Sequence, residues 1–122
     1  MKTIDNLRPL ILLVSGLLGA AGVALAAAAS HGADARLLGS ASTICLVHAP
    51  ALVALHASHH HFRTATLAAL VISAGTLLFV GDLLARHFLG TGLFPMAAPT
   101  GGMTMIAGWL IVAAGAFLRT RA

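Results

Sequence analysis

Four long apolar stretches, separated by short polar segments, constrain the fold of this chain more than any other feature. They cover about residues 9–30, 37–57, 64–84 and 99–118. A helix needs about 20 apolar residues to cross the hydrocarbon core of a bilayer. Only 8% of the 122 residues are charged, against about 25% in soluble domains. The sequence therefore predicts one integral membrane domain over residues 1–122, an all-α bundle of four transmembrane helices.

The first stretch resembles a secretory signal, because Lys2 and Arg8 precede an apolar run that ends in alanines. The run over residues 9–29 is long enough for a full span, whereas the apolar part of a signal peptide is usually shorter. We therefore interpret it as a helix that stays in the membrane. Small residues recur every four positions at Gly16, Ala20, Ala24 and Ala28, which we call the small-residue stripe, and Ser15 and Gly19 lie on the adjacent ridge. Together they predict a face for close helix packing.

The positive charges predict the orientation of the bundle. Lysine and arginine concentrate in the cytoplasmic loops of membrane proteins. One side of the predicted bundle carries Lys2, Arg8, Arg63, Arg119 and Arg121, and the other carries Arg36 and Arg86. We therefore expect both termini and the loop at residues 58–63 in the cytoplasm. The net charge of +4 comes from scattered residues rather than a basic run, so it does not indicate nucleic-acid binding.

Several motifs in this order are similar to those of the small four-helix membrane proteins known as domain of unknown function 423. They are Ala-Ala-Ser-His at 28–31, His48 within the second stretch, Gly75-Thr76-Leu77-Leu78-Phe79-x-Gly81, and Pro99-Thr100-Gly101-Gly102 with Ala107-Gly108-Trp109. The resemblance covers about residues 10–118, and the third and fourth stretches carry its most specific parts. The family includes bacterial inner-membrane proteins that resemble animal transmembrane protein 256.

The chain resembles a divergent member of that family. Ile44 and Cys45 stand where the family has a Tyr-Gln pair, and Asp82 stands where it has a serine. The resemblance implies a compact four-helix protein of the bacterial inner membrane. It implies no catalytic residue and no cofactor.

Three polar residues within or beside the apolar stretches are candidates for a functional site: His31, His48 and Asp82. An ionisable group inside a membrane span is costly and is therefore a functional candidate. His48 could accept a proton or bind a ligand near Asp82, or it could be a neutral imidazole bonded to a carbonyl or to Ser73 or Thr76. Asp82 could be solvated at a helix end, or it could face the bundle and pair with Arg86, four residues on.

A histidine cluster follows the second stretch at His56, His59, His60 and His61. His56, His59 and His60 have helical spacing that would allow them to chelate a divalent transition metal. No cysteine or carboxylate accompanies them, so the alternative is a hydrated cap at the membrane surface.

Glycines in the third and fourth stretches predict close helix packing at Gly75, Gly101, Gly102 and Gly108. The segment at residues 99–102 fits the start of a helix. Its amides could bind an anionic group, or it could re-enter the membrane packed against the first or third span.

The sequence contains no recognisable nucleophile–base pair, nucleotide-binding loop or cofactor motif, and its lone Cys45 excludes an internal disulfide. The leading hypothesis is a non-enzymatic membrane protein that binds or stabilises a partner: a lipid, another membrane protein or a second copy. A small transporter or proton-linked channel that uses His48 and Asp82 is the main alternative. A metalloprotein that uses the histidine cluster is a weaker one.

Overall fold

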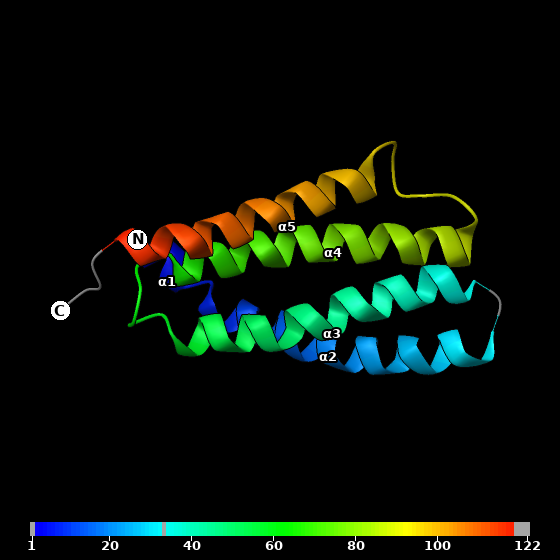
Figure 1. Cartoon of the computed structure of the whole chain (residues 1–122), viewed down its shortest axis with the longest axis horizontal. Helices are drawn as coiled ribbons and strands as arrows, with labels where there is room; N and C mark the ends of the chain where they lie inside the picture. The colour runs from blue at the N-terminus through cyan, green and yellow to red at the C-terminus, as the bar shows by residue number, and fades with distance from the viewer. Residues whose placement is uncertain (1, 33, 119–122) are drawn as a thin grey trace.

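The computed structural model describes residues 2–32 and 34–118, and every regular element in this part of the chain is helical. The elements, shown in Figure 1, are α1 (Lys2–Asp5), α2 (Arg8–His31), α3 (Ala35–Ala57), α4 (Ala65–Leu89), α5 (Ala97–Ala114) and the short 3-10 helix η1 (Gly115–Phe117). Four of them are long and apolar enough to cross a membrane. The predicted all-α fold with four membrane-spanning helices is confirmed.

The largest difference from the predicted bounds is at the end of α4, which continues to Leu89 instead of ending near residue 84. Arg86 and His87 stay in the helix because Asp82 and Asp34 bind them. Gly90 then ends the helix in the left-handed conformation, with φ of 77°. α3 continues through Pro50, and Arg119 and Arg121 lie outside the described residues.

The helices pack as two antiparallel hairpins, α2 with α3 and α4 with α5, joined by a contact between α3 and α4 (Figure 1). α4 is the most buried of the four long helices, and α2 and α5 lie at the two edges. α1, the turn between α3 and α4, and η1 lie at one end of the molecule; the other two connections lie at the opposite end. The edge helices are therefore the ones that expose most of their surface outside the chain.

Glycines bring the backbones of α4 and α5 into direct contact. A Cβ atom at Gly75 would lie 2.7 Å from the Met105 amide nitrogen, and one at Gly101 would lie 2.6 Å from that of Phe79. A Cβ at Gly108 would collide with Ile72. The fourth predicted packing glycine differs, because a Cβ at Gly102 would meet no atom within 4 Å. Gly75, Gly101 and Gly108 thus form the interface, and Gly102 does not.

α2 packs on α3 through the ridge beside the small-residue stripe, where Ser15 is buried and a Cβ at Gly19 would lie 3.7 Å from the Ala49 Cβ. Its buried residues are Ile11, Ser15, Leu18, Gly22 and Leu25. The Ser15 hydroxyl donates to the Ala49 carbonyl at 2.8 Å, and the Ser42 hydroxyl of α3 donates to the Gly22 carbonyl at 2.7 Å. These two hydrogen bonds favour a packing in which each serine faces the neighbouring helix, because a hydroxyl in an apolar medium needs a hydrogen-bond partner.

The small-residue stripe therefore points away from α3. Gly16 and Ala20 are exposed, and a Cβ at Gly16 would meet nothing within 4 Å. Of the predicted packing face, Ser15 and Gly19 lie against α3, whereas Gly16 and Ala20 stay exposed. The stripe remains as an uncovered row of small residues on an edge helix.

Candidate functional site

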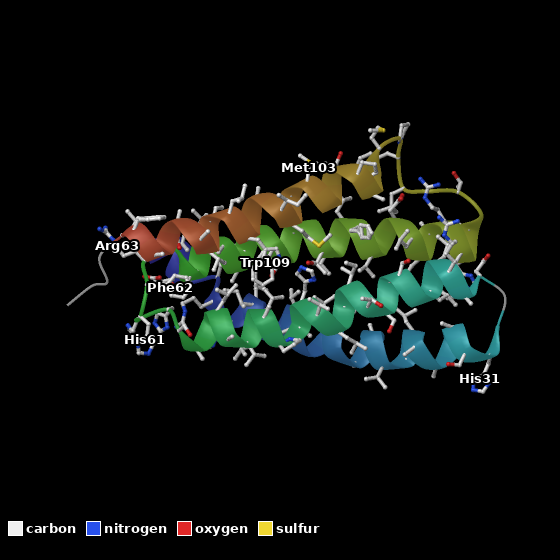
Figure 2. All side chains as sticks on the ribbon, viewed as in Figure 1. His31, His61, Phe62, Arg63, Met103 and Trp109 are labelled. Atoms are coloured by element: carbon white, nitrogen blue, oxygen red, sulfur yellow. The ribbon has the colours of Figure 1, made fainter. Side chains whose placement is uncertain are left out.

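His48 and Trp109 form a polar contact in the middle of the molecule. His48 lies on α3 and is 6% exposed, and its Nε2 lies 3.1 Å from the indole Nε1 of Trp109 on α5. The two ring centroids are 5.8 Å apart with an interplanar angle of 59°. Figure 2 shows the Trp109 side chain directed from α5 towards α3, midway along the helices.

The partners of His48 identify its protonated nitrogen. Its Nδ1 lies 2.9 Å from the Ile44 carbonyl oxygen, which can only accept a hydrogen bond. The indole N–H of Trp109 can only donate one. Nδ1 therefore carries the proton and Nε2 accepts, which is a neutral imidazole with both nitrogens bonded. This is the predicted neutral imidazole bonded to a carbonyl, but the cross-helix partner is Trp109 instead of Ser73 or Thr76.

Neither of those two hydroxyls reaches His48. The Thr76 hydroxyl donates to the Ile72 carbonyl of its own helix at 2.7 Å. The Ser73 hydroxyl is buried without a hydrogen-bond partner among the described residues.

Asp82 is fully buried and bonded on both carboxylate oxygens. Oδ2 accepts from Arg86 Nε at 2.9 Å, and Oδ1 accepts from the backbone N–H of Leu93 at 2.8 Å. A Cβ at Gly92 would lie 2.5 Å from Oδ1, so the loop after α4 folds tightly over the acid. Of the two alternatives for Asp82, the solvated helix end is wrong and the pair with Arg86 is present. The pair closes one end of the bundle and fastens the loop before α5.

The three polar candidates do not form one site. His31 is exposed at the end of α2, and Figure 2 places it far from Trp109 and hence from the His48 contact. His48 and Asp82 are each bonded to other residues. At the same end as His31, Asp34 and His87 form an exposed pair, with Oδ2 and Nδ1 2.9 Å apart. The sequence indicated neither this pair nor the partnership of His48 with Trp109.

The histidine cluster lies at the opposite end of the molecule, where Figure 2 labels His61. The rings of His59 and His60 are in contact, with centroids 3.6 Å apart and an interplanar angle of 43°. Burial and the nearby positive charge of Arg8 lower the pKa of His59. Among the described residues, no three histidine, cysteine or acidic side chains are placed to hold a metal ion. The structure thus does not assemble His56, His59 and His60 into a chelate.

Two interhelical bonds near this end fasten the turn between α3 and α4. The Arg8 guanidinium donates to the His56 carbonyl at 2.7 Å, in the last turn of α3, where carbonyls lack helical partners. The Thr64 hydroxyl donates to the Ile111 carbonyl of α5 at 2.9 Å. Arg8 therefore has a structural contact in addition to the topological role that the sequence predicted.

The segment at residues 99–102 lies within the first turns of α5 and does not begin the helix. α5 starts earlier, at Ala97, and its first-turn bond runs from the Thr100 N–H to the Met96 carbonyl at 2.9 Å. Gly101 lies against Gly75 and Phe79 of α4. Of the two alternatives for this segment, close packing against the third span is the one that the structure has.

A comparison with known protein families gives a match to the chain. The family described as "Protein of unknown function (DUF423)" matches residues 12–102, which cover most of α2, all of α3 and α4, and the start of α5. No curated protein and no solved structure matches the chain.

Proposed function

We propose that this chain, which belongs to the DUF423 family of proteins of unknown function, is a non-enzymatic membrane subunit that binds another transmembrane helix. The helix belongs to a different membrane protein or to a second copy. We place the protein in the bacterial inner membrane from its family resemblance, and its termini in the cytoplasm from the distribution of lysine and arginine.

The uncovered small-residue stripe on α2 carries this proposal. In a bilayer, helices associate mainly by close packing, since lipid tails are as apolar as the side chains. Small residues at every fourth position let two backbones approach, as Gly75 and Gly101 do between α4 and α5. The stripe has the same character but faces outward, with open space at Gly16. A helix from outside the chain could pack closely against this stripe, and lipid tails do not provide such close packing.

The bonded state of the internal polar groups supports a binding role over a proton-linked transporter. Both nitrogens of His48 and both carboxylate oxygens of Asp82 have partners within the chain. A proton carrier would need to exchange these bonds for water along a path between the two residues. Binding of another helix at the small-residue stripe requires no exchange of these hydrogen bonds.

Site-specific photo-crosslinking in native membranes tests the proposal. A photoreactive amino acid at Val23, which is 64% exposed beside the stripe, is expected to capture a protein partner. The same group at Leu77, 50% exposed on α4, serves as the control and is expected to capture lipid only. Mass spectrometry of the adduct separates a second copy from a different protein.

A paired variant shows whether the stripe is responsible. Gly16→Leu with Ala20→Leu should abolish the Val23 adduct while preserving the fold, because the added side chains project outside the chain. Gly102→Leu adds the same side chain at another open position and should leave the adduct unchanged. Equal adducts from Val23 and Leu77, or an adduct that survives the paired variant, would contradict the proposal.

A further inference from the structure

A groove with polar and apolar halves opens between α3 and α4, at the end of the molecule that holds His31. Two adjoining cavities of about 620 and 380 Å³ form it, and they share Arg36, Ser40 and Phe79 as lining residues. The groove does not include the small-residue stripe, so a ligand bound in the groove would be independent of the partner helix proposed for α2.

One wall of the groove is a row of hydrogen-bond donors on α3. Arg36, Ser40 and Thr43 are spaced four and three residues apart and so lie on one helix face. Among the described residues, none of these side chains takes part in a hydrogen bond or an ion pair. The Ser40 and Thr43 hydroxyls do not bond back to their own helix, unlike that of Thr76. The row is therefore available to a ligand from outside the chain.

The groove also contains a carboxylate near its cation. Asp34 and Arg36 line the same 380 Å³ cavity. Asp34 uses Oδ2 for His87 and is 48% exposed, so its Oδ1 can still accept a hydrogen bond. A ligand that fills this cavity meets one positive and one negative group, which favours a headgroup that itself carries both charges.

The position of these residues corresponds to the layers of a membrane leaflet. Arg36 is in the first turn of α3, and Thr43 lies about 10 Å further along the helix. The headgroup region of one leaflet is about 5–8 Å thick. Arg36 and Asp34 then lie at headgroup depth, Ser40 near the ester groups, and Thr43, Ile44 and Phe79 where the ester groups meet the acyl chains.

We propose that this groove binds one phospholipid whose headgroup carries a primary ammonium, such as phosphatidylethanolamine. Arg36 donates to the phosphate, for which its planar guanidinium is suited. Asp34 accepts from the ammonium, Ser40 and Thr43 donate to ester oxygens, and an acyl chain lies over Phe79. A quaternary ammonium cannot donate to Asp34, and a glycerol headgroup brings no cation to it.

Native mass spectrometry of the purified full chain, with lipids added after delipidation, tests this. Phosphatidylethanolamine is expected to be retained as a single molecule, more strongly than phosphatidylcholine or phosphatidylglycerol of the same acyl chains. Arg36→Gln should reduce its retention about tenfold or more, because a charge-assisted bond is lost. Arg63→Gln removes an exposed arginine at the other end of the molecule and should have no effect.

Two further variants separate the parts of the groove. Asp34→Asn should remove the preference for the ethanolamine headgroup over the glycerol headgroup while phospholipid is still retained. Gly39→Leu should block the groove, because Gly39 lines it and a Cβ there meets no atom within 4 Å. Gly102→Leu is the matched control, since the same change at another open site should leave retention unchanged.

Several results would overturn the proposal. Equal retention of the ethanolamine and choline lipids would exclude recognition of the ammonium, and unchanged retention in Arg36→Gln would exclude the phosphate contact. Displacement of the lipid by inorganic phosphate alone would make the groove a free-anion site. A dimer that Gly39→Leu dissociates would make it an interface between copies. If Gly39→Leu unfolds the chain, the Arg36 and Asp34 variants still decide the outcome.

Discussion

The close contact between α4 and α5 predicts opposite effects for the same substitution at two neighbouring glycines, Gly101→Ala and Gly102→Ala. A Cβ at Gly101 would lie 2.6 Å from the Phe79 amide nitrogen and 2.8 Å from the Gly75 carbonyl oxygen. Both are backbone atoms that no rotamer change can move. Since such contacts are normally about 3.5 Å or more, the helices must separate by most of an ångström. At Gly102 the added methyl group meets nothing within 4 Å.

The magnitude follows from two terms. Overpacking of a close interface costs about 1–3 kcal/mol, and Gly→Ala within a helix recovers up to about 1 kcal/mol in either variant. The propensity term cancels when the two variants are compared. Gly101→Ala should therefore unfold with a free energy about 1–3 kcal/mol below that of Gly102→Ala.

Reversible unfolding in mixed micelles, followed by far-UV circular dichroism as the fraction of denaturing detergent rises, measures both free energies. Gly75→Ala belongs in the same series and should resemble Gly101→Ala, because its Cβ would lie 2.7 Å from the Met105 amide nitrogen. If Gly101→Ala proves as stable as Gly102→Ala, the two helices do not meet backbone to backbone and the reasoning fails.

Three further predictions concern the polar contacts and the orientation. Asp82→Leu should lower the stability in detergent by about 1–3 kcal/mol, because the Leu93 N–H loses its acceptor. Asp82→Asn keeps an acceptor and should destabilise the protein less. An Asn variant less stable than the Leu variant would contradict the buried pair. Trp109→Phe should destabilise the protein by a similar amount, since it leaves the buried Nε2 of His48 without a donor; a double-mutant cycle with His48→Ala that shows no coupling would refute this bond. Topology reporters fused to both termini and inserted in the 58–63 loop should indicate the cytoplasm, and a C-terminal fusion that reports the periplasm would reverse the proposed orientation.

The sequence was sufficient for the features that depend on local spacing or on length. Four apolar runs of span length determined the number and type of the long helices. The pair of Asp82 and Arg86 was one of two alternatives that the sequence offered, because a separation of four residues places both side chains on one helix face. The burial of Asp82, which excludes the solvated alternative, came only from the tertiary structure.

Only the tertiary structure decided which face of each helix is buried. In a soluble protein the polar face of a helix marks the outside, but lipid and helix interface are equally apolar. The small-residue stripe and the buried face of α2 thus look alike in hydropathy, and the bonds of Ser15 and Ser42 across the α2–α3 contact select between them. For the same reason, hydropathy does not distinguish Gly101 from Gly102. The two glycines differ because the backbone of α4 lies against Gly101 and not against Gly102. The contact of His48 with Trp109 joins residues 61 positions apart, on helices of different hairpins, so no local spacing could indicate it.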